Sequence, residues 1–253
     1  MTDLFDLTGK VALVTGTSRG LGQGMAIALA QAGADVATLD RSPADATVQA
    51  IRACGRRALP LSCDLAQATV GELREVVDEA VAALGHVDIL VNNAGIIRRA
   101  PAVDIDPADW DDVLRVDLDA AFWLTQAAGR RFVAQGHGKI VTVASALSFQ
   151  GGINVAAYTA AKHAVAGMTK ALANEWAGAG VNVNAIAPGY MATDNTAPLR
   201  ADPARSSAIG ERIPAGRWGT PADLAGAVIF LSSAASDYVH GTVLVVDGGW
   251  LCR

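Results

Sequence analysis

Short apolar runs alternate along the chain with longer stretches in which apolar residues recur at helical spacing. The runs are four to six residues long and rich in β-branched residues, which is typical of buried strands. They cover residues 11–14, 36–39, 58–61, 87–91, 139–143, 181–186 and 243–246. The stretches between them predict helices over residues 21–32, 44–53, 70–84, 110–134, 156–177 and 221–232.

The order of these elements predicts the fold class. Strands that alternate with helices form a parallel sheet covered by helices on both faces. No linker, repeat or low-complexity stretch divides the 253 residues, so we predict one α/β domain with a doubly wound parallel sheet. Residues 189–219 are polar and rich in Pro and Arg, and we expect an irregular, mobile segment there, lying over a site.

Composition narrows the class of protein. With 51% hydrophobic and 18% charged residues the chain is not disordered, and its net charge of −5 argues against a nucleic-acid partner. Cys54, Cys63 and Cys252 lack paired spacing, so we expect neither a disulfide framework nor a metal site. The first residues resemble no signal peptide, and no apolar run is long enough to span a membrane. We therefore expect a cytoplasmic protein with no membrane partner.

A glycine-rich turn follows the first predicted strand and opens directly into the first predicted helix. Glycines in such a turn let a pyrophosphate approach the backbone N–H groups at the helix N-terminus. The position of the turn therefore predicts a dinucleotide site. The residues expected to contact the dinucleotide here are Gly16, Thr17, Ser18, Arg19, Gly20, Leu21 and Gly22.

Asp40 stands at the end of the second predicted strand, 20 residues after Gly20. A carboxylate there accepts hydrogen bonds from the adenosine ribose hydroxyls and repels a 2′-phosphate. We therefore predict NAD as the cofactor, in preference to NADP. Arg19 and Arg41 stand close by in the sequence, either as partners for a 2′-phosphate or as solvated loop residues, and both alternatives stay open.

Tyr158 and Lys162 stand four residues apart on one predicted helix, so their side chains share a face. A tyrosine is a poor acid–base catalyst near neutral pH until a nearby positive charge lowers its pKa. Ser145, at the end of the fifth predicted strand, adds a hydroxyl that can hold a substrate oxygen. These three residues are the candidate catalytic groups.

Taken together, these motifs resemble the short-chain dehydrogenase/reductase family, over residues 7–249. The matching features are the glycine turn, Asp64, Asn92-Asn93-Ala94-Gly95, the set of Ser145, Tyr158 and Lys162, Pro188-Gly189 with Thr193, and Asp247-Gly248-Gly249. The resemblance implies a seven-stranded Rossmann-like domain over residues 1–253. Its dinucleotide-binding part would cover about 7–145, and its catalytic and substrate part about 145–253. It also implies a homotetramer that is assembled through the helices at 110–134 and 156–177.

The resemblance also implies roles for individual residues. Tyr158 would be the general acid or base, Lys162 would lower its pKa and bind the nicotinamide ribose, and Ser145 would polarise the substrate carbonyl. Other positions match cofactor contacts of the family. These are Asp64, Leu65, Asn92, Ala94, Gly95, Pro188, Gly189 and Thr193.

One position departs from the family pattern. Asp117 stands where the family usually has an asparagine, which positions a water in a proton relay from Lys162. A carboxylate still accepts a hydrogen bond from water but cannot donate an amide hydrogen. We keep Asp117 as a candidate catalytic residue, and a retained role and a rearranged relay both stay open.

Several segments are similar to the branch of the family that acts on keto-deoxy sugar acids. Such a substrate carries a carboxylate and hydroxyls, which require cationic and amide partners. The candidate substrate contacts are Arg98, Ser145, Gln150, Tyr190 and Arg217. Arg98 could instead be an exposed charge, and Arg217 an interface residue. The alternatives for the function are a reductase of 3-oxoacyl thioesters, a dehydrogenase of another polyol, and a non-catalytic dinucleotide-binding protein.

Overall fold

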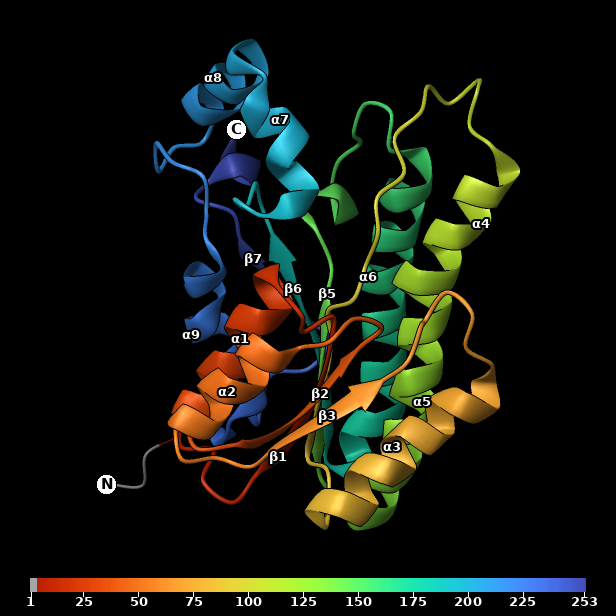
Figure 1. The fold of residues 1–253 in the computed structure, drawn as a ribbon, viewed down its shortest axis with the longest axis vertical. Helices are drawn as coiled ribbons and strands as arrows, with labels where there is room; N and C mark the ends of the chain where they lie inside the picture. The colour runs from red at the N-terminus through yellow and green to blue at the C-terminus, as the bar shows by residue number, and fades with distance from the viewer. Residues whose placement is uncertain (1–3) are drawn as a thin grey trace.

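The computed structural model describes residues 4–253. Within these residues seven parallel strands form one sheet, in the order β3-β2-β1-β4-β5-β6-β7 (Figure 1). The strands are β1 (Val11–Thr15), β2 (Asp35–Asp40), β3 (Ala58–Ser62), β4 (Ile89–Asn92), β5 (Gly138–Val143), β6 (Val181–Pro188) and β7 (Val243–Val246). The predicted α/β doubly wound fold is confirmed. The strand order reverses between β1 and β4, and in such sheets ligands bind at the carboxyl ends of the strands at this point.

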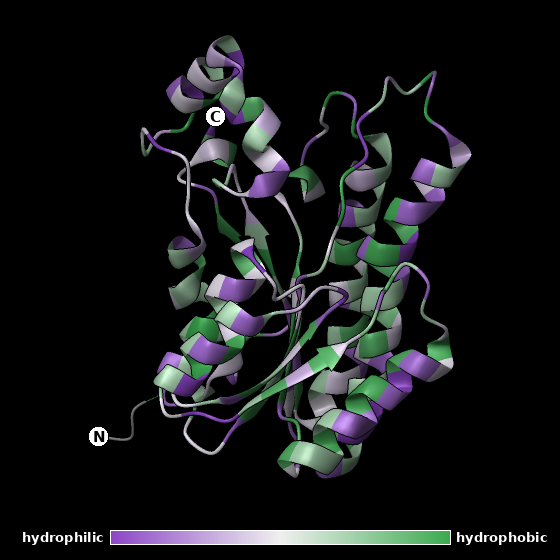
Figure 2. Cartoon of the chain, in the orientation of Figure 1, coloured by the Kyte–Doolittle hydropathy of each residue, from purple (hydrophilic) through white to green (hydrophobic). Residues whose placement is uncertain are grey.

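Helices cover both faces of the sheet (Figure 1). One face carries α1 (Gly20–Gln31), α2 (Asp45–Ala53) and α9 (Ala225–Ser232). The other carries α3 (Val70–Leu84), α4 (Pro107–Leu114), α5 (Ala121–Gln135) and α6 (Ala156–Trp176). Hydrophobic positions follow the strands, and helices such as α3 alternate between hydrophobic and hydrophilic positions (Figure 2). No helix of residues 4–253 is both long and apolar enough to cross a membrane.

Side chains of the central strands point alternately into two apolar cores. Leu13 and Leu90 pack under α3 and α5, whereas Val14 and Val91 pack under α1 and α9. All four are fully buried. Burial on both faces explains why the strands appear in the sequence as continuous apolar runs and not as alternating patterns.

The long helix predicted at 110–134 differs from the prediction in two ways. It begins earlier, at Pro107, because the Asp106 side chain caps it by accepting a hydrogen bond from the Ala108 N–H. A wider π-helical turn (Arg115–Ala120) then separates α4 from α5. Such turns within α-helices are frequent at functional sites, and this one buries the Asp117 side chain.

The prediction of an irregular segment at 189–219 is wrong for its middle part. Two helices, α7 (Ala197–Ala201) and α8 (Pro203–Arg212), lie beyond the carboxyl end of β6 (Figure 1). Asp202 caps α8 by accepting from the N–H groups of Ala204 and Arg205. Because α8 buries only Ile209, it has no apolar periodicity that could reveal it in the sequence.

Candidate active site

The glycine turn leaves its backbone open to a ligand. Gly16 and Gly20 have positive φ, of 71° and 64°. A Cβ on Gly16 would lie 2.9 Å from the Ala94 Cα, and one on Gly22 would lie 2.1 Å from the Gly16 carbonyl oxygen, so neither position accepts a side chain. Among the described residues, no side chain caps the N-terminus of α1, which leaves its first N–H groups free for an anion. This cradle fits a pyrophosphate.

Asp40 is held in place beside this turn. Its carboxylate accepts hydrogen bonds from the backbone N–H groups of Ser18, at 2.8 Å, and Ser42, at 3.0 Å. These two contacts fix the carboxylate at the carboxyl end of β2. Thr17 is buried, and its carbonyl accepts from the Thr47 hydroxyl at 2.7 Å. Arg41 is exposed next to Asp40.

The segment after β4 ties the turn to the rest of the site. The Asn93 side-chain amide donates to the carbonyl oxygens of Thr15, at 2.9 Å, and Gly16, at 3.2 Å. The backbone N–H of Ala94 donates to the Thr15 hydroxyl at 2.9 Å. Asn92 instead faces away from the turn and donates to the Thr125 hydroxyl on α5 at 2.8 Å. Ala94 and Gly95 therefore border the site through their backbone.

Residues after β3 and β6 complete the predicted cofactor set. Asp64 is exposed after β3, while the neighbouring Leu65 is buried in the apolar core. Pro188 ends β6, and Gly189 packs so closely on β7 that a Cβ there would lie 2.7 Å from the Asp247 Cα. Thr193 lies against the glycine turn, with its Cγ2 3.8 Å from where a Cβ on Gly20 would be.

Two arginines connect the loop after β6 to the opposite side of the site. Arg19, in the glycine turn, lies 3.3 Å from the Asp194 carboxylate, and both side chains are exposed. Arg99 donates to the Asn195 carbonyl oxygen at 3.0 Å. The loop therefore spans the carboxyl ends of the central strands, from α1 to the segment after β4.

The three candidate catalytic residues come together at the carboxyl end of β5. Lys162 and Tyr158 lie one turn apart on α6, with Lys162 Nζ 5.4 Å from the centre of the phenol ring. The Ser145 side chain lies close enough to Tyr158 to lower the pKa of its phenol. Lys162 is buried and donates to the Val143 carbonyl oxygen at 2.9 Å. A substrate oxygen placed between Ser145 and Tyr158 would meet both hydroxyls.

Ser148 fixes the spacing between Ser145 and α6. Its hydroxyl donates to the Lys162 carbonyl oxygen at 2.7 Å and accepts from the Ser145 backbone N–H at 3.3 Å. This role was not among those predicted from the sequence. Its signal is the spacing of three residues between Ser145 and Ser148, which cap a short helical turn reciprocally.

Asp117 forms a buried ion pair with the catalytic lysine. Its Oδ2 lies 3.3 Å from Lys162 Nζ, and its Oδ1 accepts from the Ile96 backbone N–H at 2.7 Å. Only 1% of Asp117 and 3% of Lys162 are exposed, so water screens the pair poorly. Gly95 makes room for it, because a Cβ there would lie 3.0 Å from Oδ2.

The charges of Tyr158, Lys162 and Asp117 shift one another's pKa values. Burial raises the pKa of Tyr158; the Lys162 ammonium opposes this shift, and the Asp117 carboxylate adds to it. Burial also raises the pKa of Asp117, against the opposing effect of Lys162. Burial alone lowers the pKa of Lys162, but the negative charges of Asp117 and Tyr158 outweigh it and raise that pKa overall. Lys162 therefore stays an ammonium beside the phenol.

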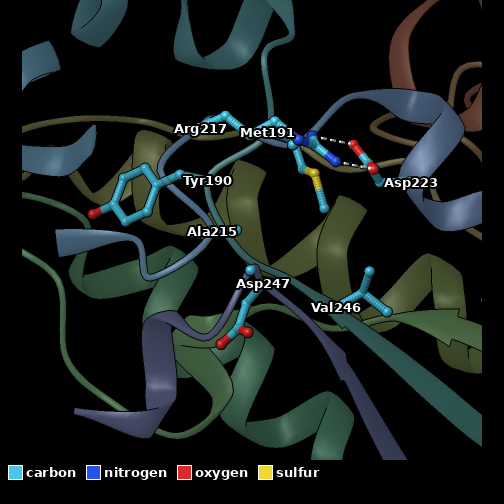
Figure 3. Close-up of a pocket in the computed structure, with 9 residues that line it drawn as sticks. Tyr190, Met191, Ala215, Arg217, Asp223, Val246 and Asp247 are labelled. Atoms are coloured by element: carbon cyan, nitrogen blue, oxygen red, sulfur yellow. Dashed lines mark hydrogen bonds and ion pairs between the residues drawn. The ribbon is translucent and has the colours of Figure 1, made fainter. Parts of the chain in front are cut away.

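Two of the candidate substrate contacts are already paired with acids. Arg98 lies 3.0 Å from Asp109 and 3.2 Å from Asp112, both on α4. Arg217 forms a two-bond ion pair with Asp223, at 2.8 and 2.6 Å. Figure 3 shows its guanidinium turned toward Asp223.

Gln150 and Tyr190, two more of the five candidates, line a cavity of about 310 Å³. Tyr190 also borders the smaller cavity of Figure 3, where its ring points away from the Arg217 guanidinium. Both residues follow strands that end at the catalytic group, β5 and β6. Among residues 4–253, no group of three or more His, Cys, Asp or Glu side chains could hold a metal ion.

Comparison with known proteins adds three findings. A family model described as enoyl-(acyl carrier protein) reductase matches residues 16–251. The chain is 54% identical to 2-dehydro-3-deoxy-D-gluconate 5-dehydrogenase of Escherichia coli (strain K12), over 98% of both chains. It is also similar to a solved structure described as a 2-deoxy-D-gluconate 3-dehydrogenase from Agrobacterium tumefaciens with bound NADP. That structure has a TM-score of 0.93 and 55% identity over the whole of both chains.

Proposed function

Because this chain belongs to the short-chain dehydrogenase/reductase family, we propose that it is an NAD-dependent dehydrogenase of a deoxy sugar acid. The reaction moves a hydride between nicotinamide and carbon 5 of 2-dehydro-3-deoxy-D-gluconate. The observation that carries the proposal is the group of Ser145, Tyr158 and Lys162 beside an open glycine turn. The identity to the Escherichia coli relative supports the choice of substrate class.

The proton chemistry follows from the geometry of α6. When an alcohol is oxidised, Tyr158 takes the hydroxyl proton; when a ketone is reduced, it returns that proton. Ser145, beside Tyr158, holds the same substrate oxygen and polarises it. The Lys162 ammonium stabilises the phenolate that forms, because it lies 5.4 Å from the ring centre.

The cofactor residues divide between the two ends of a dinucleotide. Residues 16–22 would hold the pyrophosphate, and Asp40 and Asp64 the adenosine end. The backbone of Ala94 and Gly95, with Pro188, Gly189 and Thr193, would border the nicotinamide end together with Lys162. When bound, the nicotinamide supplies or accepts the hydride. We assign residues of about 7–145 to dinucleotide binding, and those of about 145–253 to catalysis and the substrate.

We propose a preference for NAD(H) over NADP(H), although the similar Agrobacterium structure holds NADP. Two backbone N–H groups hold the Asp40 carboxylate in place, which leaves a negative charge where a 2′-phosphate would lie. Arg19 is paired with Asp194. Arg41 is the exposed cation that would partly offset the repulsion and admit NADP as the weaker cofactor.

We further propose that Asp117 is a positioning residue. It accepts from Ile96 with one oxygen and holds Lys162 with the other, whereas an asparagine has a single acceptor oxygen and could make only one of these contacts. Its negative charge adds an effect that an amide lacks, because it raises the pKa of Tyr158.

The predicted homotetramer and cytoplasmic location stay proposals. Light scattering of the purified protein tests the oligomeric state.

The experiment that tests this function is a substrate panel followed by nicotinamide absorbance. Purified protein is assayed with 2-dehydro-3-deoxy-D-gluconate, D-gluconate and a neutral polyol, each with NAD⁺ and with NADP⁺. A 3-oxoacyl thioester is assayed with NADH and with NADPH. We expect the highest kcat/KM for the deoxy sugar acid with NAD⁺. A higher value for the thioester would replace the proposal with the reductase alternative, and the absence of any turnover would favour a non-catalytic binding protein.

A further inference from the structure

A sugar-acid substrate needs a cation for its carboxylate, at some distance from the reacting hydroxyl. The two arginines that the sequence suggested are poorly placed for this task. Arg98 and Arg217 already have carboxylate partners on the protein, at 3.0–3.2 Å and 2.6–2.8 Å. A substrate would have to displace these acids or share the arginine with them.

The cavity next to Gln150 provides an alternative. It measures about 310 Å³, within the range of small-molecule sites. One wall is residues 150–153 of the segment after β5, and the other is α8. Ala146, directly after Ser145, packs in one apolar cluster with Ile209 of α8 and Trp250. Ser145 itself does not line the cavity, but its neighbour in the chain packs against two residues that do.

The charge in this cavity is positive. Arg205 and Arg212 line it, and no acidic residue does so. Arg205 is exposed and has no ion-pair partner among residues 4–253. The Arg212 guanidinium stacks over Trp250, 3.8 Å from the ring centre. Among the described residues it donates one hydrogen bond, a long one of 3.4 Å to the Arg253 carbonyl oxygen. Stacking orients the guanidinium but leaves N–H groups at its edge free.

The aromatic residues around Arg212 make this arrangement rigid. Trp250 packs edge to face on Tyr190, with ring centres 4.5 Å apart, and Tyr190 packs in the same way on Trp218. Trp250 is 4% exposed, and its Nε1 is a buried donor with no acceptor among the described residues. An unsatisfied buried donor is costly, and an oxygen of a bound ligand would relieve that cost.

We propose that Arg212, assisted by Arg205 and the Gln150 amide, binds the carboxylate of the substrate. This inference rests on the proposed function and specifies how its substrate is recognised. The guanidinium of Arg212 lies over the Trp250 ring, which limits where its N–H groups can meet a planar carboxylate. Arg205, about two turns earlier on the same helix, adds a second charge, and Gln150 adds amide hydrogens from the facing wall. The reacting hydroxyl of the same molecule then extends toward Ser145 and Tyr158.

The test compares a charged substrate with its neutral form. Arg212→Met keeps an apolar stem over Trp250 and removes the charge, and Arg205→Ala removes the second cation. Each variant is assayed with 2-dehydro-3-deoxy-D-gluconate and with its methyl ester, at saturating cofactor. Arg74→Met, on α3 and remote from the cavity, controls for the loss of one surface arginine.

We expect Arg212→Met to lower kcat/KM for the acid by about ten- to a hundredfold, mainly through KM, and for the ester by less than about threefold. Arg205→Ala has a smaller effect of the same kind, and Arg74→Met has none. An equal loss on acid and ester, or no loss on the acid, overturns this inference and leaves the proposed function standing. An unmodified protein that turns over neither compound overturns both. Thermal unfolding of each variant identifies a loss that comes from misfolding.

Discussion

Replacing Asp117 with Asn removes one buried negative charge and keeps the shape of the side chain. The amide oxygen of the new side chain can still accept from the Ile96 N–H, which Asp117 binds at 2.7 Å. The attraction between Asp117 and Lys162 Nζ at 3.3 Å is lost. Since the carboxylate raises the pKa of Tyr158, its removal lowers that pKa.

The distances give the size of the shift. Oδ2 lies 3.3 Å from Lys162 Nζ, which lies 5.4 Å from the centre of the Tyr158 ring. Asp117 Oδ2 is therefore within about 9 Å of that ring centre, and at an effective dielectric constant of about 20 two unit charges at this distance interact by about 2 kcal/mol. That energy corresponds to a pKa shift of about one unit.

The assay is the pH dependence of kcat/KM in both directions, at saturating cofactor. Alcohol oxidation needs the Tyr158 phenolate, so its rate rises with pH through the pKa of Tyr158. Ketone reduction needs the phenol, so its rate falls through the same pKa. In Asp117→Asn we expect both curves to move to lower pH by about one unit, while the maximal rates stay within about tenfold.

Asp119→Asn is the matched control, because Asp119 is exposed on the same π-helical turn. It removes the same formal charge but should leave both curves in place, since water screens it. Unchanged curves in Asp117→Asn would mean that Asp117 carries no charge in the working enzyme. A shift to higher pH, or a shift in one direction of reaction only, would refute the assignment of Tyr158 as the titrating group.

Three further substitutions test separate parts of the site. Lys162→Met should lower both kcat and the affinity for NADH, measured by fluorescence titration; an effect on kcat alone would remove the ribose contact from the account. Asp40→Ser should narrow the preference for NAD⁺ over NADP⁺ by relieving repulsion of the 2′-phosphate, and equal kcat/KM for both cofactors in the unmodified protein would contradict the role of Asp40. Arg98→Ala should lower kcat/KM equally for the sugar acid and its methyl ester, because Arg98 is bound to α4; a loss confined to the acid would return Arg98 to the carboxylate site.

The central sheet could be predicted because its strands are buried on both faces. The run at residues 11–14 has no polar position to interrupt it, and the observed strand exceeds it by a single residue, the buried Thr15. The catalytic group could be predicted for a related reason. Tyr158 and Lys162 are fixed to each other by one helical turn, and the end of β5 brings Ser145 to them.

The features that could not be predicted from the sequence depend on contacts between distant segments or on helices without an apolar face. The pairing of Arg98 with α4 follows from the turn that carries residues 107–114 back over the segment after β4. The helix α8 is polar on all sides but one, so its two cavity arginines looked like residues of an irregular loop. The π-helical turn has no sequence signature, yet it buries Asp117 against Lys162.

Turnover and NADH binding of Tyr158→Phe decide whether Tyr158 is the acid–base catalyst. This change removes the transferable proton and leaves the ring on α6 and the glycine turn intact. We expect kcat for the deoxy sugar acid to fall by about 10²- to 10⁴-fold, while the NADH dissociation constant stays within about twofold. A variant that keeps more than about a tenth of the kcat of the unmodified protein would contradict the claim that Tyr158 is the acid–base catalyst.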